Sequence, residues 1–206
     1  MAEKLAIEGG KPVRDKPFPR WPIYGEEEIQ LIAEILHSGN THFRKSWVSK
    51  EFERRFAEWN GSKHAICCNS GTSAIHMALA AVGVGPGDEV IVPPRTFIGT
   101  VSPVLYQNAV PVFADIDPKT HNISPDAIRK VITKRTRAII VVHFYGQMCD
   151  MDPIMELANR RNIPVFEDIA QAPFVKYKGR LAGLSLIHIS EPTRPLYISY
   201  AVFCLK

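Results

Sequence analysis

Pro164-Val-Phe-Glu-Asp-Ile-Ala-Gln-Ala172 is the stretch where a predicted helix ends and a strand with two carboxylates follows. Its proline ends a helical pattern, and the two apolar residues that follow indicate a short buried strand. Two carboxylates, Glu167 and Asp168, come where that strand should end, and Gln171 follows. The carboxyl ends of strands are where α/β sheets bind ligands, although an isolated acid pair also fits a solvated strand end. The rest of the chain favours the ligand site.

A repeated order of strand, turn and helix surrounds this stretch. Five apolar segments indicate strands: residues 65–68, 89–92, 111–116, 138–142 and 165–166. The segment 138–142 is apolar throughout, which is typical of parallel strands buried on both faces. Helical patterns with capping and turn residues lie between the segments. The sequence therefore predicts an α/β domain with a parallel-rich sheet flanked by helices.

The first part of the chain precedes this repeat. Residues 1–25 are rich in Pro and Gly and are expected to form an extended arm. A helix should follow, with Ile29, Ile32 and Leu36 in a buried stripe together with Ile35. A second helix should carry an aromatic face made of Phe52, Phe56 and Trp59.

Composition narrows the class of protein. The chain has 206 residues, 46% of them hydrophobic and 22% charged, which predicts one globular domain. The net charge of +4 is scattered, so no nucleic-acid surface is predicted. Four cysteines without metal-ligand spacing indicate reduced core thiols, and no metal site is expected. No leader or long apolar run is evident, which predicts a soluble, cytoplasmic protein without a membrane partner.

The turn Asn69-Ser-Gly-Thr-Ser73 lies between a predicted strand and a predicted helix. Its small residues allow close approach of a ligand to the backbone, and free N–H groups at a helix start attract an anion. An N-cap turn that binds nothing is the alternative. The turn has neither the Gly-Lys-Ser/Thr of a Walker A loop nor a GxGxxG fingerprint.

Thr96-Phe97 lies at another junction of strand and helix, and its ring is either a buried helix start or a surface for a planar cofactor. A phosphate turn, a stacking ring and Asp168 at a strand end together describe a site for pyridoxal 5′-phosphate (PLP). The pyridinium nitrogen of this cofactor pairs with an aspartate, and its phosphate rests on a helix N-terminus.

Several short motifs, in this order, carry a resemblance to a known family. They are Leu5-Ala-Ile-Glu-Gly-Gly-Lys11, Ser70-Gly-Thr72, Gly85-Pro-Gly-Asp-Glu-Val-Ile-Val-Pro93, Val112-Phe-Ala-Asp-Ile-Asp117, Tyr145-Gly146, Asp150-Met151 and Glu167-Asp-Ile-Ala-Gln171. With them, residues from about 5 to 183 resemble the DegT/DnrJ/EryC1/StrS family of PLP-dependent sugar aminotransferases. That family has the aspartate-aminotransferase (type I) fold.

The resemblance implies roles for particular residues. Gly71 and Thr72 would hold the phosphate, and Phe97 would stack on the cofactor ring. Asp168 would pair with the ring nitrogen, and Gln171 would reach the ring hydroxyl. His143 and Tyr145, near a strand end, are expected to be packing residues.

The resemblance also implies an activity and partners. The family transfers an amino group, usually from glutamate or glutamine, to a keto-sugar nucleotide or a keto-cyclitol. It works as a homodimer with active sites at the interface, which gives the N-terminal arm a docking surface. The opening Ile7-Glu-Gly-Gly-Lys-Pro-Val13 is similar to the cyclitol and aminobenzoate branches.

The sequence departs from the family after Gly183, where a Gly-Asp pair, a Phe-Ser-Phe strand and the Schiff-base lysine would follow. Residues 184–194 and 198–206 instead resemble a translated reading frame of a sequencing adapter and its primer. We therefore expect an arm at 1–25, an incomplete PLP-binding large domain at 26–183 and a non-native tail at 184–206. Lys206 has a setting that does not match the catalytic lysine, so no catalytic residue is assigned and this chain alone is expected to be inactive.

The departure has a structural consequence too. The type I sheet has the strand order 3-2-4-5-6-7-1, and this chain should be truncated after about the fifth strand. The strand at 65–68 should then lack a neighbour, and the fifth strand should keep a bare edge.

Two alternatives to the aminotransferase stay open at this point. A sugar dehydratase of the same family has a histidine in place of the lysine, and the deciding position lies beyond the matching residues. A non-catalytic domain that binds PLP for sensing or regulation is the other.

Overall fold

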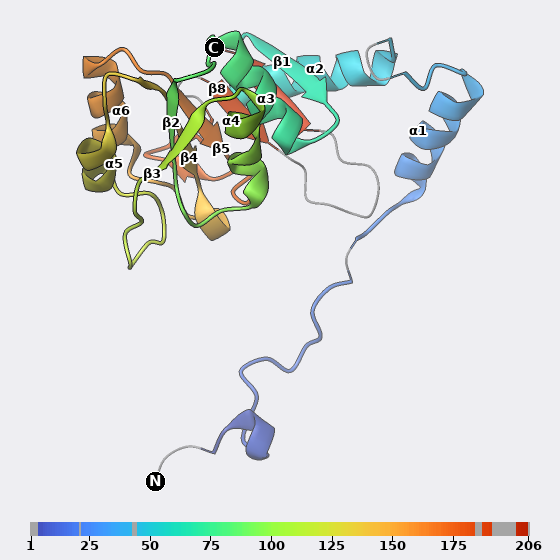
Figure 1. The fold of residues 1–206 in the computed structure, drawn as a ribbon. Helices are drawn as coiled ribbons and strands as arrows, with labels where there is room; N and C mark the ends of the chain where they lie inside the picture. The colour runs from blue at the N-terminus through green and yellow to red at the C-terminus, as the bar shows by residue number, and fades with distance from the viewer. Residues whose placement is uncertain (1–3, 21, 43–44, 184–186, 191–200, 206) are drawn as a thin grey trace. The chain divides into compact units, whose positions relative to one another are not determined.

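The computed structural model describes residues 4–20, 22–42, 45–183, 187–190 and 201–205 (Figure 1). The chain divides into two compact units, Met1–Gly39 and Asn40–Lys206. Lys206, which the sequence analysis weighed and set aside as a catalytic lysine, lies outside the described residues. Within the described ranges, no helix combines the length and the apolar character needed to cross a bilayer.

The first unit contains the 3-10 helix η1 (Ala6–Glu8) and the helix α1 (Glu26–His37). The carboxylate of Glu28 accepts a hydrogen bond from the Gly25 N–H at 2.6 Å and so caps the start of α1. Within this unit the expected stripe on α1 is not buried, because Ile29, Ile32 and Leu36 are 56%, 50% and 64% exposed and Ile35 is half-buried. Their periodicity implies a packing partner that the described part of this unit does not contain.

The second unit carries the sheet and its helices. The helices are α2 (Trp47–Asn60), α3 (Gly71–Ala81), α4 (Ser102–Tyr106), α5 (Pro125–Val131) and α6 (Met151–Arg160), with the 3-10 helices η2 (Ile98–Thr100) and η3 (Phe144–Gly146). The strands are β1 (His64–Cys68), β2 (Glu89–Val92), β3 (Val110–Phe113), β4 (Thr136–Val142), β5 (Val165–Asp168), β6 (Lys176–Tyr177), β7 (Arg180–Leu181), β8 (Ile187–Ser190) and β9 (Ala201–Leu205). All five predicted strands are present, with ends that differ by a few residues.

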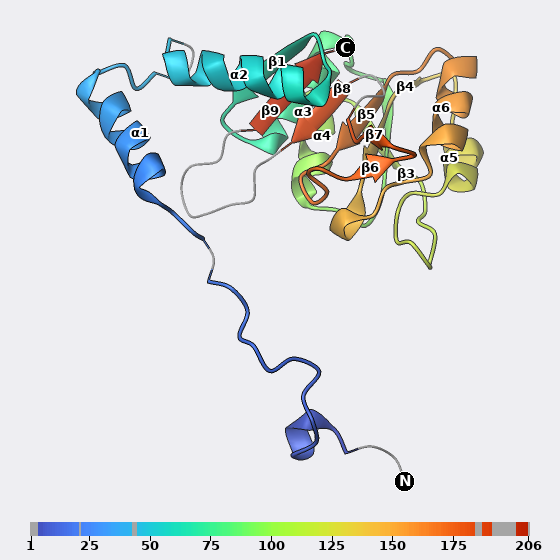
Figure 2. The same cartoon turned by 180° about the vertical axis from the view of Figure 1, so that it is seen from behind.

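The main sheet has the order β1-β9-β8-β5-β4-β2-β3. Strands β3, β2, β4, β5 and β8 pair in parallel, and β9 pairs antiparallel with both β8 and β1. A separate hairpin of β6 and β7 lies in front of the sheet when the molecule is seen from behind (Figure 2). The prediction of an α/β fold with a parallel-rich sheet flanked by helices is confirmed.

The expectation of an unpaired first strand and a bare edge on the fifth strand is wrong. The backbone of β8 pairs with β5, and the backbone of β9 joins β8 to β1. The physical reason is that a ladder of N–H and C=O groups satisfies any extended backbone, so its pairing does not require the family's own sequence. The tail therefore occupies the positions that the sequence analysis left open.

Alternating side chains of the central strands divide the core between two faces. Val90, Ile140 and Phe166 pack with α3 and α4, the helices in front of the sheet in Figure 1. Ile91 and Val165 pack on the other face with residues of α5 and α6. Because side chains of a strand alternate between its faces, Asp168 lies on the same face as Phe166, and Glu167 lies on the same face as Val165. The acid pair is thus divided between two environments.

Glu89 begins β2 with a buried carboxylate. It accepts hydrogen bonds from the Thr133 hydroxyl at 2.5 Å and from the Arg135 guanidinium at 2.6 and 2.9 Å. The Thr133 hydrogen bond and the Arg135 partner hold the pKa of Glu89 below its ordinary value of 4.5. A depressed pKa means that the folded state prefers the ionised form, so this stabilisation exists above pH 4.5 and disappears as the pH falls through the folded pKa.

Glu89→Gln is therefore expected to lower the free energy of unfolding by about 1–3 kcal/mol at pH 7. Urea denaturation of both proteins between pH 7 and pH 3 should show the two stability curves converging in acid. Glu156→Gln, which removes an exposed i,i+4 pair with Arg160, is the matched control and should cost about 0.5 kcal/mol or less. A Glu89→Gln difference that is independent of pH would contradict this assignment.

Candidate functional site

A cavity of about 240 Å³ opens near the carboxyl ends of β4 and β5. Its lining residues are Gly71, Thr72, Ile75, Thr96, Phe97, Gly99, Thr100, Val142, Asp168, Ala170 and Gln171. The five site residues named from the sequence, which come from three separate segments, all line it. The strand-helix junctions bring these segments together, as expected for ligand sites in α/β sheets.

Gly71 and Thr72 form the first turn of α3, directly after β1 and its turn. The Ser70 hydroxyl caps the helix by accepting a hydrogen bond from the Ser73 N–H at 3.1 Å. Within the described part of the chain, the N–H groups of Gly71 and Thr72 have no hydrogen-bond acceptor. Unsatisfied donors at the start of an eleven-residue helix favour an anion at this end of the cavity.

Asp168 ends β5 and supplies a carboxylate that is 8% exposed. One carboxylate oxygen accepts a hydrogen bond from the Thr100 hydroxyl at 3.2 Å, and the other from the Ala170 N–H at 3.0 Å. The Thr100 hydroxyl is in turn 2.8 Å from the hydroxyl of Thr96. These contacts hold the carboxylate at the cavity wall, where a cationic N–H group of a ligand would offset its burial.

Phe97 and Gly99 shape the wall between these polar ends. The Phe97 side chain is 53% exposed, so its ring is accessible to a planar ligand. A Cβ atom on Gly99 would lie 2.6 Å from Oγ1 of Thr72 and 2.8 Å from Cδ1 of Phe97. Glycine is thus required for the close approach of those two side chains.

Gly99→Ala is expected to force these neighbours apart and to lower the free energy of unfolding by about 1–3 kcal/mol. Gly85→Ala is the matched control, since nothing lies within 4 Å of a Cβ at Gly85. Urea denaturation of both variants measures the difference. Equal stabilities for the two would show that the Gly99 contacts can relax without cost.

Gln171 lies at the cavity and contacts the turn after β4. Its Oε1 atom accepts a hydrogen bond from the Tyr145 N–H at 3.1 Å, which leaves the Nε2 amide as the donor of this side chain.

The expectation that Tyr145 is a packing residue is wrong, because its side chain is 77% exposed. Its backbone is left-handed, with a φ of 49°, and its ring lies 4.2 Å from that of Phe144, centroid to centroid. The Arg95 guanidinium lies over the ring of Phe144, 4.5 Å from its centroid.

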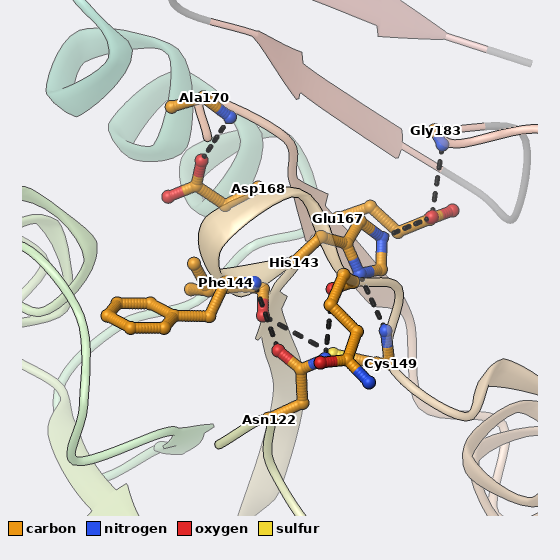
Figure 3. Close-up of polar contacts among 10 residues, drawn as sticks. Asn122, His143, Phe144, Cys149, Glu167, Asp168, Ala170 and Gly183 are labelled. Atoms are coloured by element: carbon orange, nitrogen blue, oxygen red, sulfur yellow. Dashed lines mark hydrogen bonds and ion pairs between the residues drawn. The ribbon is translucent and has the colours of Figure 1, made fainter. Parts of the chain in front are cut away.

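His143 is fully buried, as expected of a packing residue, but it also forms a polar network (Figure 3). Its Nε2 atom is 2.8 Å from a carboxylate oxygen of Glu167, and its Nδ1 atom accepts a hydrogen bond from the Cys149 N–H at 3.1 Å. The same Glu167 oxygen accepts a hydrogen bond from the Gly183 N–H at 3.0 Å. Burial, together with the Glu167 charge, raises the pKa of the Cys149 thiol to about 12, so this cysteine is not a nucleophile at neutral pH.

Sequence reasoning assigned no role to Thr96, Gly99 or Thr100, and it missed the role of Glu167 in this network. The signal for the first three was the run Thr96-Phe-Ile-Gly-Thr100, in which small and hydroxyl residues flank the aromatic ring. The signal for Glu167 was the alternation of strand side chains, which separates it from Asp168.

The model of the DegT/DnrJ/EryC1/StrS aminotransferase family matches residues 22–187. This chain belongs to that family. The match covers more than half of the chain and includes every residue that lines the cavity. The resemblance stated from the sequence is confirmed.

Two relatives have names that state a reaction or a product. The chain is 42% identical over 188 residues to L-glutamine:2-deoxy-scyllo-inosose aminotransferase of Streptomyces lividus, with 89% of this chain and 44% of that protein covered. It is 50% identical over 144 residues to GDP-perosamine synthase of Caulobacter vibrioides, with 67% and 39% covered. The chain thus spans less than half the length of these relatives.

Solved structures agree with the observed fold. An aminotransferase from Psychrobacter cryohalolentis superposes with a TM-score of 0.86 at 39% identity, covering 92% of this chain and 49% of that one. NtdA from Bacillus subtilis, solved with its cofactor pyridoxamine phosphate (PMP) bound, has a TM-score of 0.75 at 30% identity, with 88% and 42% covered. The described sheet and helices correspond to about half of such a structure.

Proposed function

We propose that this chain supplies the PLP-binding half of an aminotransferase that transfers an amino group from glutamate or glutamine to a keto-sugar nucleotide or a keto-cyclitol. The observation that supports the proposal most strongly is that one cavity is lined by Gly71, Thr72, Phe97, Asp168 and Gln171. Family membership and the reactions named for the relatives support the reaction class.

The residues of the cavity fit PLP at each of its ends. The free N–H groups of Gly71 and Thr72 suit the phosphate, and the Phe97 ring suits the face of the pyridine. The buried carboxylate of Asp168 suits a protonated ring nitrogen, and the Nε2 amide of Gln171 can donate to the ring oxygen. When bound, PLP supplies an electron-withdrawing ring that stabilises negative charge next to the transferred nitrogen.

The described residues that line the cavity include no lysine. We therefore propose that this chain binds PLP without catalysing turnover by itself. Proton transfer in the complete protein would depend on residues outside the matched half.

The experiment that tests the proposal is a titration of the purified chain with PLP, followed by absorbance and by equilibrium dialysis. We expect saturable binding at one site per chain, and weaker binding of pyridoxal, which lacks the phosphate. An unsaturable titration would overturn the proposed cofactor. Equal affinities for PLP and pyridoxal would overturn the phosphate role of Gly71 and Thr72.

We also propose a homodimer for the complete protein. The first unit, taken by itself, exposes apolar side chains, among them Ile7 at 93%, Phe18 at 80% and Ile23 at 71%. A second copy of the chain would cover this surface and the exposed stripe of α1. Analytical ultracentrifugation of the complete protein over a range of concentrations tests the proposed dimer. We expect a dimer, and a monomer at all concentrations would contradict the proposal.

The division into an arm at 1–25, a PLP-binding domain at 26–183 and a non-native tail at 184–206 remains our proposal. The backbone pairing of β8 and β9 is compatible with it, because a ladder does not depend on native sequence. Sequencing the source DNA beyond the Gly183 codon tests the division. A continuous reading frame through residues 184–206 in independently prepared DNA would overturn the assignment of the tail.

A further inference from the structure

His143 contacts both members of the strand-end acid pair. Its backbone N–H donates a hydrogen bond to the Asp168 carbonyl at 3.1 Å, and its ring lies 2.8 Å from the Glu167 carboxylate. The two strands are also in register here, with Val142 opposite Asp168. One residue at the end of β4 therefore fixes the end of β5 through its backbone and through its side chain.

The hydrogen bonds define the form of this histidine. Nδ1 accepts a hydrogen bond from the Cys149 N–H, so that nitrogen carries no proton. Nε2 must then carry the proton and donate it to Glu167. The pair is consequently a neutral imidazole that donates to a carboxylate, buried to 0% and 1% exposure.

Glu167 links this pair to another segment of the chain. The same Oε2 atom accepts the Gly183 N–H at 3.0 Å, which ties the turn after β7 to the strand end. Figure 3 shows the Glu167 and Asp168 side chains leaving adjacent residues in different directions. In a strand, a fixed side chain on one face sets the rotation of the backbone and hence the direction of the next side chain.

We propose that His143 and Glu167 are positioning residues for the cofactor site, because their hydrogen bond behind β5 fixes the direction in which Asp168 presents its carboxylate. This inference rests on the proposed function. Neither residue lines the cavity beside Asp168, so both act through the backbone of the strand end.

Two substitutions at His143 distinguish the effect of its hydrogen bond to Glu167 from that of its hydrogen bond with the Cys149 N–H. Glutamine places an amide nitrogen at the position of Nε2 and keeps the donor to Glu167. Asparagine places an amide oxygen at the position of Nδ1, so it keeps the acceptor for the Cys149 N–H and loses the donor. We expect His143→Asn to raise the dissociation constant for PLP about tenfold and His143→Gln to raise it less than about threefold.

A further variant and a second readout separate positioning from a general loss of structure. Glu167→Gln keeps an oxygen that can accept from both His143 Nε2–H and the Gly183 N–H, so it should bind PLP nearly as the unmodified chain does. Glu167→Ala should weaken binding as much as His143→Asn does. His121→Asn controls for the loss of a histidine. His121 is exposed and has a φ of 61°, a backbone conformation that asparagine tolerates. Nitrogen NMR of the unmodified chain should show the His143 tautomer that carries its proton at Nε2.

The outcomes are distinct. Tight binding to the unmodified chain, with His143→Asn weaker than His143→Gln, is the expected result. Equal PLP affinities for these two variants, or an NMR signal of the Nδ1-protonated tautomer, would overturn the positioning role while leaving the proposed function intact. No PLP binding to the unmodified chain would overturn the proposed function and this inference with it.

Discussion

Asp168→Asn is expected to weaken PLP binding by about 10- to 150-fold. The carboxylate is buried and forms the cavity wall, so its partner there should be the protonated ring nitrogen of the cofactor. A hydrogen bond to a charged group contributes about 1.5–3 kcal/mol, which corresponds to that range in the dissociation constant. Asparagine keeps an oxygen for the Ala170 N–H, so the strand end should stay in place.

The measurement is an absorbance titration with PLP alongside a matched variant. Asp152→Asn removes an exposed carboxylate that pairs with Lys178 and does not line the cavity, so it should leave the affinity unchanged. Urea denaturation of both variants verifies that they are folded. An unchanged affinity in Asp168→Asn would remove Asp168 from the site.

Phe166→Ala is expected to lower the free energy of unfolding by about 3–5 kcal/mol. The ring is fully buried in the cluster between the sheet and α3, and alanine would leave a cavity there. A domain is typically stable by about 5–15 kcal/mol, so this single change would remove a large part of the total.

Urea denaturation measures the effect, with Phe113→Ala as the matched control. Phe113 lies in β3 with 53% of its side chain exposed, and its replacement should cost about 1 kcal/mol or less. A loss below about 1 kcal/mol in Phe166→Ala would contradict the packing described for this face of the sheet.

Periodicity and turn residues predicted the five strands and the parallel-rich sheet. The rule that α/β sheets bind ligands at the carboxyl ends of their strands also predicted that the cavity residues lie close together, because strand ends and helix starts meet at one edge of such a sheet. Gly71, Thr72, Phe97, Asp168 and Gln171 accordingly line one cavity although they span 101 positions of the chain.

Other features depend on information that a pattern does not carry. The pairing of β8 and β9 uses backbone N–H and C=O groups that every residue except proline has, so no side-chain pattern indicated it. The His143–Glu167 pair joins residues 24 positions apart and required the register of β4 against β5. Tyr145 has a positive φ, which is uncommon for a residue other than glycine and which no sequence pattern indicated.

The central claim is that Asp168 faces the ring nitrogen of PLP in this cavity. NMR of the chain with PLP labelled with ¹⁵N in its pyridine ring tests the claim most directly. We predict that the bound ring nitrogen is protonated at pH 8, and that it is not protonated when PLP is added to Asp168→Asn. An unprotonated ring nitrogen in the unmodified chain, or the same signal in both proteins, would contradict the account.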